Sequence, residues 1–370
     1  MPFQRMLTMA SVAATLLFLG WGADLFWFAT RPLDPSQSQK VILEVQPGAT
    51  GASVTQELVR VGAIDDPWRL MWLARTTRAW KRLKTGEYEI SASQTPLQIL
   101  ETLGSGKSVN HPFTVPEGEN LFEIAAAVEK AGIGPKEEFI SLCKDSEFIA
   151  GLGFGENAPP TLEGYLFPET YFLARQTSIR GLVEKMVRRS LAFWSEETLA
   201  KAASMGLSRH EAVTLASMIE KETGAPEERP LISSVFHNRL KKRMRLQSDP
   251  TTIYGMWDHY EGKLSRADLR TPSPYNTYTV PALPAGPIAN PGTEALQAAL
   301  TPAESSHLFF VSRNDGTHEF TDNLADHNSA VEKLQRDPKA REGKSWRDLT
   351  RKLETERGTT VKPTSRRSGN

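Results

Sequence analysis

The sequence contains very little cysteine and has no net charge. Of its 370 residues only Cys143 is a cysteine, so no intramolecular disulfide can form and a cysteine-based metal site is not expected. No histidine pair has the spacing of zinc ligands, and no G-x-S-x-G nucleophile motif is present. We therefore expect neither a metal nor a cofactor. The 44 Lys and Arg balance 44 Asp and Glu, which gives no electrostatic reason to expect a nucleic-acid partner.

Charge is also missing near the N-terminus. Residues 6–23 include no charged side chain, and the apolar run extends over 7–29, close to the roughly 20 residues that span a bilayer. A cleaved signal peptide is the alternative, with Gly20 and Gly22 as the small residues before the cut. Because the apolar run continues through 25–29, we favour an uncleaved single-pass anchor, with the large C-terminal part exported.

The rest of the chain divides into segments of different character, and the fold class that we predict is α+β. The predicted organisation is a cytoplasmic head at 1–6, a transmembrane helix at 7–29, a Pro/Ser/Gln linker at 30–40, a β-α-α-β module at 41–112, a second small α/β subdomain at 113–154, a mixed α/β domain at 155–338, and a polar, basic tail at 339–370 that we expect to be disordered. Within the module we expect strands at 41–45 and 86–91, helices at 53–61 and 67–75, and then a helix from Thr95 to Leu103.

The helix predicted from Ser208 to Gly224 has a carboxylate on its apolar face. Ser208 and Glu211 have the spacing of a capping box, and a glycine is suited to end a helix. At about 100° per residue, Glu220 falls among the apolar side chains, whereas Glu211 and Glu222 point toward solvent.

This position predicts unusual chemistry for Glu220. Burial and the negative pole of the helix dipole both favour its neutral form. A carboxylic acid that is protonated near neutral pH can act as a general acid. The alternative is a structural glutamate that is paired with an arginine such as Arg239 or Arg245.

Four further segments combine aromatic side chains with amides and carboxylates. Aromatic faces stack on sugar rings, and amides and carboxylates bind hydroxyl groups. The segments are 161–173, 244–255, 273–292 and 308–328. The last is predicted to contain a β-hairpin that turns at Asp315 and Gly316. Together with Glu220 they indicate a cleft that binds a polymer.

Six sequence blocks resemble the signature blocks of YceG-like endolytic murein transglycosylases. They occur in the family's order within about 41–334 and read LEGYLFPETY, ASMIEKET, VFHNRL, RLQSDPTTIYG, SPYNTYT…LPAGPIANPG and FTDNLADHN. The resemblance implies an inner-membrane anchor, a LysM-like module at 41–112 and a periplasmic catalytic domain that cuts peptidoglycan glycan strands. The family's catalytic glutamate maps to Glu220.

The resemblance also implies the reaction and the partners. Glu220 protonates the leaving glycosidic oxygen between N-acetylmuramic acid and N-acetylglucosamine, and the muramyl 6-hydroxyl then closes onto C1 to give a 1,6-anhydro end. We expect the protein to act in cell elongation and wall synthesis, with penicillin-binding proteins and other wall-synthesis proteins as candidate partners. The residues that we predict to bind or orient the glycan strand are Tyr165, Glu169, Gln247, Asp249, Asn276, Tyr278 and Asn323.

Two other functions fit the same residues. A lysozyme-type hydrolase would use Glu220 as the acid together with a carboxylate such as Asp249, and would leave reducing ends. A non-catalytic peptidoglycan-binding scaffold would use the module at 41–112 for affinity, with Glu220 in a structural role.

Overall fold

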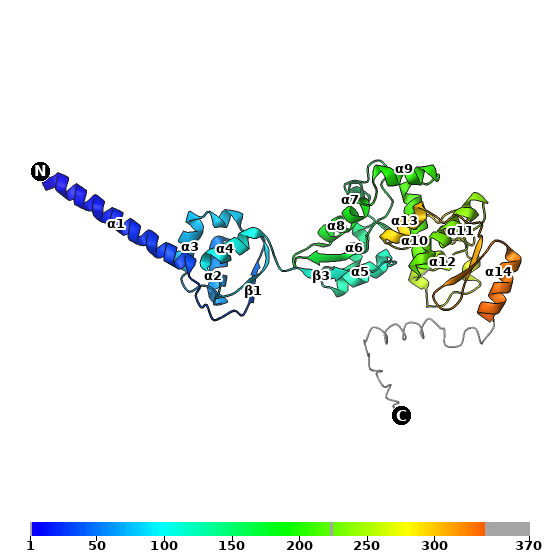
Figure 1. The fold of residues 1–370 in the computed structure, drawn as a ribbon, viewed down its shortest axis with the longest axis horizontal. Coiled ribbons are helices and arrows are strands. Elements are labelled where there is room, and N and C mark those ends of the chain that lie inside the picture. The colour runs from blue at the N-terminus through cyan, green and yellow to red at the C-terminus, as the bar shows by residue number, and fades with distance from the viewer. Residues whose placement is uncertain (1, 223–224, 337–370) are drawn as a thin grey trace, which may run out of the picture. The chain divides into compact units, whose positions relative to one another are not determined.

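The computed structural model describes residues 2–222 and 225–336. The chain divides into two compact units (Figure 1). Unit 1 holds the residues up to Phe113 together with Tyr171–Thr177, and unit 2 holds Thr114–Thr170 and the chain from Ser178 onward. The predicted tail at 339–370 and the predicted helix end at Gly224 lie outside the described residues.

Unit 1 is built on two antiparallel strands that are covered by helices. Its elements are α1 (Pro2–Thr30), β1 (Val41–Val45), α2 (Gly51–Arg60), α3 (Pro67–Thr76), the 3-10 helix η1 (Ala79–Arg82), β2 (Gly86–Ile90) and α4 (Pro96–Ser105). Strands β1 and β2 pair with Val41 opposite Ile90. The β-α-α-β order is the predicted one. Helix α4 runs two residues beyond its predicted end and stops at Gly106, whose φ of 74° suits a glycine.

The C-terminal turns of α1 are part of the core of unit 1. Leu25, Phe28 and Ala29 are buried against the module. The side chains that precede them in α1 include exposed large apolar residues, among them Leu16, Leu17, Phe18 and Leu19. The stretch Ser11–Thr30 is long and apolar enough to cross a membrane.

The chain passes between the units at two short strands and again after Thr177. Strand β3 (His111–Thr114) leads into unit 2, and β4 (Thr170–Leu173) leads back. The two strands pair with each other.

Unit 2 is mainly helical. Its elements are α5 (Leu121–Lys130), α6 (Lys136–Leu142), α7 (Ser146–Ala150), α8 (Ile179–Leu191), α9 (Glu196–Ser204), α10 (Arg209–Glu222), η2 (Pro226–Glu228), α11 (Arg229–Lys241), α12 (Asp249–Gly255), η3 (Trp257–His259), η4 (Asp268–Arg270), α13 (Thr293–Leu300), β5 (Phe309–Ser312), β6 (His318–Thr321), α14 (Leu324–Val331) and the π-helical turn η5 (Glu332–Arg336). Strands β5 and β6 form the predicted hairpin, with Gly316 at a φ of 93° in its turn.

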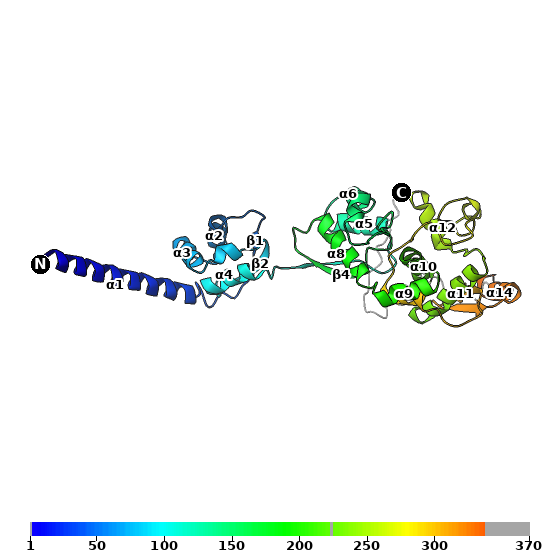
Figure 2. The same ribbon diagram turned by 90° about the horizontal axis from the view of Figure 1, so that it is seen from above.

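Helix α10 is the central helix of unit 2. It contacts α9, α11, α12 and α13, which lie around it in Figure 1, and Figure 2 shows α9, α11 and α12 beside it from above. The predicted capping box is present, because the Ser208 N–H donates to Glu211 at 2.8 Å and the Glu211 N–H donates to the Ser208 hydroxyl at 3.2 Å. Every residue from Ala212 to Ile219 is buried. The helix is therefore enclosed on all sides over this stretch and has no solvated face there.

Candidate active site

Glu220 lies in the last turn of α10 with only 5 % of its side chain exposed. One carboxylate oxygen accepts a hydrogen bond from Nη2 of Arg229 at 2.9 Å, and the other accepts from the Gly292 N–H at 2.9 Å. Gly292 precedes α13, whose first turn therefore faces the carboxylate with a backbone donor. The two donors fix the orientation of Glu220, which confirms that it lies on the inner side of the helix.

Arg229 begins α11 and joins three carboxylates. Its guanidinium is 8 % exposed and pairs with Glu220, with Glu294 and, at 3.6 Å, with Glu117. Burial raises the pKa of Glu117, and the charge of nearby Glu220 raises it further. We call these four side chains the Arg229 cluster. Arg229 and Glu294 also line a cavity of about 740 Å³ that Glu197, Lys201 and Gln297 border.

The structure corrects the predicted partner of Glu220. An arginine does pair with it, but the arginine is Arg229 rather than Arg239 or Arg245. Arg239 is buried and donates instead to the carbonyls of Leu308 and Leu246, both at 2.7 Å. It therefore ties a loop and the start of β5 to α11. Arg245 is exposed.

A turn at 116–120 covers the end of α10. Gly118 has a φ of 80°, and a Cβ at this position would lie 3.6 Å from Cγ of Glu220. The Gly118 N–H donates to the Asn290 carbonyl at 3.0 Å, and Nζ of Lys221 donates to the Gly118 carbonyl at 3.1 Å. The turn is thus fastened both to α10 and to the segment that precedes α13.

A buried polar pair supports this turn. The Asn290 side chain donates to Glu163 at 2.9 Å and to the Glu119 carbonyl at 3.0 Å. The Glu163 carboxylate also accepts from the Leu121 N–H at 2.9 Å and from the Tyr254 hydroxyl at 2.8 Å. Burial raises the pKa of Glu163 to about 7. Glu163 and Asn290 hold the surroundings of Glu220 in place without touching it.

The prediction that Glu222 points into solvent is wrong. Its side chain is half-buried and accepts a hydrogen bond from the Ser248 hydroxyl. Burial raises the pKa of Glu222 to about 7, and the charge of Asp249 acts in the same direction. The prediction from helical periodicity failed because α12 and the segment before it cover the side of α10 that the sequence pattern predicted to be exposed to solvent.

Four of the predicted binding residues gather around the N-terminus of α12. Gln247 is exposed, has a φ of 51°, and donates its N–H to the Thr277 carbonyl at 3.2 Å. Asp249 is exposed and accepts from the Tyr278 hydroxyl at 2.6 Å. Asn276 is buried, and its amide donates to the Thr271 carbonyl at 2.8 Å. The exposed side chains here can meet a ligand, whereas Asn276 stabilises the loop that carries Tyr278.

The other three predicted residues lie elsewhere. Tyr165 is fully buried, with its hydroxyl 3.2 Å from Nδ1 of His210, so its ring has no free face for a sugar. Glu169 is exposed and pairs with Arg189 at 2.9 Å.

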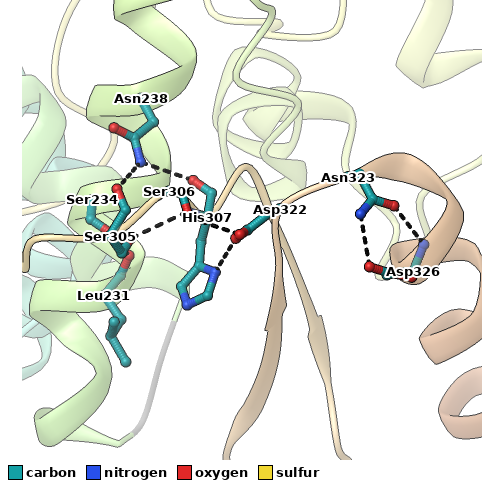
Figure 3. Close-up of polar contacts among 9 residues, drawn as sticks. All are labelled: Leu231, Ser234, Asn238, Ser305, Ser306, His307, Asp322, Asn323 and Asp326. Carbon is teal, nitrogen blue, oxygen red and sulfur yellow. Dashed lines mark hydrogen bonds and ion pairs between the residues drawn. The ribbon is translucent and has the colours of Figure 1, made fainter.

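Asn323 is the N-cap of α14. Its side chain points to Asp326 of its own helix and accepts from the Asp326 N–H at 3.0 Å (Figure 3). In the same view the neighbouring Asp322 turns the other way, toward His307, whose Nδ1 lies 2.6 Å from its carboxylate. Asn323 therefore serves the start of α14 in this structure.

The sequence patterns did not indicate that Glu117, Arg229 and Glu294 lie next to Glu220. They come from a turn, the start of α11 and the start of α13, and no local pattern links these positions. Glu163 belonged to a segment that the sequence singled out, but its role as a buried acceptor depends on long-range partners. Among the described residues there is no group of three or more His, Cys, Asp or Glu side chains that could hold a metal ion.

Comparisons with known proteins identify relatives of this chain. The endolytic murein transglycosylase of Bacillus subtilis (strain 168) is 32 % identical over 317 residues, which cover 82 % of this chain and 87 % of that protein. The protein of the same name from Streptococcus pneumoniae (strain ATCC BAA-255 / R6) is 27 % identical over 336 residues, or 81 % of this chain, but this chain spans only 59 % of it.

A solved structure and a family model also match this chain. The crystal structure of a YceG-like protein from Listeria monocytogenes matches with a TM-score of 0.53 and 30 % identity, and covers 79 % of this chain and 99 % of that one. The model of the YceG-like family matches residues 43–333. The chain therefore belongs to the YceG-like family.

Proposed function

We propose that this chain is an endolytic murein transglycosylase that cleaves the β-1,4 bond between N-acetylmuramic acid and N-acetylglucosamine without using water. Its family and the names of its relatives support this assignment. The observation that carries it is the position of Glu220. The Glu220 carboxylate faces inward at the end of the central helix and is oriented by one guanidinium and one backbone N–H.

In the proposed reaction, Glu220 acts first as an acid and then as a base. It donates its proton to the glycosidic oxygen, and the bond from that oxygen to C1 of the muramyl residue breaks. The resulting carboxylate takes the proton of the muramyl 6-hydroxyl while that oxygen bonds to C1. Glu220 ends protonated as it began, and the product carries a 1,6-anhydro ring. The substrate's own hydroxyl replaces water at high effective concentration, so no second carboxylate is required.

The charges of the Arg229 cluster favour proton uptake close to Glu220. Three carboxylates share one guanidinium, and full ionisation would leave an excess of negative charge that proton uptake relieves. The raised pKa of Glu117 is in the direction that this sharing requires. Arg229 and Gly292 orient the Glu220 carboxyl group, and Glu117 lies beside it in the cluster.

We assign the binding of the glycan strand to the polar side chains around the N-terminus of α12. Exposed Gln247 and Asp249 and half-buried Tyr278 present an amide, a carboxylate and an aromatic ring, which are the groups that recognise sugar hydroxyls and ring faces. Asn276 acts as their positioning residue.

We further propose that α1 is a single-pass anchor in the inner membrane and that both units lie on its periplasmic side. The anchor would hold a wall-cutting enzyme beside the machinery of cell elongation and wall synthesis, where penicillin-binding proteins are candidate partners. The β-α-α-β module of unit 1 has the element order of a LysM-like module, and we propose that it binds peptidoglycan.

The reaction is tested by digesting purified peptidoglycan with the full-length protein in ¹⁸O-labelled water and analysing the new glycan ends by mass spectrometry. We expect every new muramyl end to be 1,6-anhydro and free of label, because no water enters the bond. Labelled reducing ends would overturn the proposal in favour of a hydrolase.

The variant Asp249→Asn sharpens this test. If Asp249 only binds the strand, the variant lowers the rate and leaves the product unchanged. If labelled reducing ends form and then disappear in Asp249→Asn, Asp249 activates water and the enzyme is a lysozyme-type muramidase.

A further inference from the structure

The surface of α3 and η1 in unit 1 is rich in tryptophan and basic residues. The stretch 67–84 contains three of the chain's eight tryptophans, six Lys or Arg, and no Asp or Glu. Trp68 is 69 % exposed and stacks on Trp72, with ring centroids 6.0 Å apart. Trp72 is half-buried against the core of unit 1, so Trp68 is the exposed member of the pair. Exposed tryptophan with nearby cations is typical of protein segments that lie at a membrane surface.

These side chains form a groove, which we call the α3 groove. It has a volume of about 620 Å³ and is lined by Pro67, Trp68, Met71, Trp72, Ala74, Arg75, Arg78, Trp80 and Lys81. Its floor is apolar, whereas Arg75, Arg78 and Lys81 are exposed. An apolar floor with cationic edges suits a ligand that has both an acyl chain and an anionic headgroup.

The groove adjoins the apolar helix α1. The ring of Trp21 meets the ring of Trp72 edge-on, with centroids 5.6 Å apart. Arg69 of α3 pairs with Asp24 of α1 at 3.0 Å. The groove is thus continuous with the surface of the helix that we propose as the anchor.

The length of α1 determines how close unit 1 lies to the bilayer. Leu25, Phe28 and Ala29 are buried in the core of unit 1, so the last turns of α1 cannot face lipid. The part of the predicted transmembrane helix that precedes these turns, 7–21, rises about 22 Å, which is less than the roughly 30 Å of the hydrocarbon layer. A span that ends at Trp21 leaves no spacer between the bilayer and α3.

We propose that the α3 groove docks onto the bilayer in which α1 is embedded, with its tryptophans among the acyl chains and Arg75, Arg78 and Lys81 on anionic phospholipid headgroups. The proposal rests on the anchoring role assigned to α1. Each cation near an anionic membrane surface contributes about fivefold to binding, so three cations with an apolar floor hold the groove at the surface. Unit 1 then lies at the surface of the membrane rather than above it.

The test uses the full-length protein reconstituted into phosphatidylglycerol vesicles whose acyl chains are brominated. An environment-sensitive fluorophore is attached to a cysteine at Trp68→Cys, with Phe18→Cys as the reference in α1 and Val59→Cys as an exposed control on α2. Native Cys143 is buried and is replaced by alanine in all three. We expect the bromines to quench the labels at 18 and 68 but not the label at 59.

Charge reversal tests the role of the headgroups. In Arg75→Glu/Arg78→Glu/Lys81→Glu the quenching at 68 should fall more than fivefold, while quenching at 18 persists. The matched control Lys241→Glu/Lys242→Glu/Arg243→Glu replaces three exposed basic residues of unit 2. It should leave the quenching at 68 and at 18 unchanged.

Three results would overturn the inference. The label at 68 could stay unquenched while the label at 18 is quenched. Neither could be quenched, in which case the anchor is wrong as well. Finally, the fluorescence of the label at 68 could depend on the protein-to-lipid ratio and not on bromination of the lipid. That result would mean that a second copy of the chain covers the groove. None of these measurements uses enzymatic activity, so the proposed reaction can fail or hold independently.

Discussion

Glu220 and Glu222 are two residues apart on α10 but have different partners. Glu220 accepts from Arg229 and Gly292, whereas Glu222 accepts from Ser248 and lies near Asp249. Both carboxylates face protein, so burial alone does not identify the acid. Glu220 is distinguished because it shares Arg229 with two other carboxylates, and because two donors fix its orientation.

Substitution separates the two carboxylates. Glu220→Gln preserves shape but removes the transferable proton, so the rate of 1,6-anhydro end formation should fall about 100-fold or more, while circular dichroism shows a folded protein. Glu211→Gln is the matched control, since glutamine also completes a capping box. If Glu222→Gln loses more activity than Glu220→Gln, the acid is Glu222 instead.

The raised pKa of Glu222 predicts how stability depends on pH. The unfolded value is about 4.3 and the folded value is about 7, so between these values the folded state binds more protons than the unfolded state. The free energy of unfolding should therefore fall as the pH rises from about 4.3 to about 7, by at most about 1.4 kcal/mol per pH unit for this group.

Thermal unfolding at a series of pH values measures this slope. Glu163 contributes in the same direction, because its pKa is also raised to about 7. The slope should therefore be reduced, but not abolished, in Glu222→Gln, and should be unchanged in Glu211→Gln. An equal slope in the unmodified protein and in Glu222→Gln would show that the pKa of Glu222 is not raised by folding.

At the scale of single elements, the local patterns in the sequence were good predictors. Strand β1 has its predicted bounds, the β5–β6 hairpin turns where Gly316 allows it, and α10 begins after the predicted capping box. These features depend on neighbours in the sequence. The burial of Glu222 and the pairing of Arg229 could not be predicted, because they depend on which distant segments cover α10.

The polar pair under the 116–120 turn gives a prediction at this scale. Asn290→Asp places a second carboxylate beside Glu163 and removes the donor to the Glu119 carbonyl. We expect a loss of about 3 kcal/mol or more in the free energy of unfolding, with a loss of activity because the turn over Glu220 is released. The measurement is chemical denaturation, with the exposed Asn157→Asp as control.

The double variant Glu163→Gln/Asn290→Asp exchanges the amide and the carboxylate. It should recover about 1 kcal/mol or more relative to the sum of the single effects, because one complementary pair is restored. Strictly additive losses would show that the two side chains act independently.

At the scale of the whole molecule, the family match and the apolar helix are separate pieces of evidence. The match covers residues 43–333 and so includes parts of both units. Helix α1 ends at Thr30 and lies entirely before it. Membership of the family therefore does not by itself establish an anchor, and the topology of α1 requires its own test.

That test starts from the side chains of α1 that lie ahead of the core of unit 1. Leu16 and Phe18 are exposed and apolar, and an arginine at the centre of a membrane helix costs about 2.5–3.5 kcal/mol. We expect the unmodified chain to sediment with membranes at its full mass of 41.1 kDa, with a C-terminal alkaline phosphatase fusion active outside the cytoplasm. Leu16→Arg/Phe18→Arg should abolish both the sedimentation with membranes and the phosphatase activity. Leu324→Arg, at an exposed leucine of α14, should change neither of these two properties.

A signal peptide would instead be cut near Gly20 and Gly22. Recovery of a soluble exported chain that begins after these residues would therefore show that the protein is secreted and not anchored.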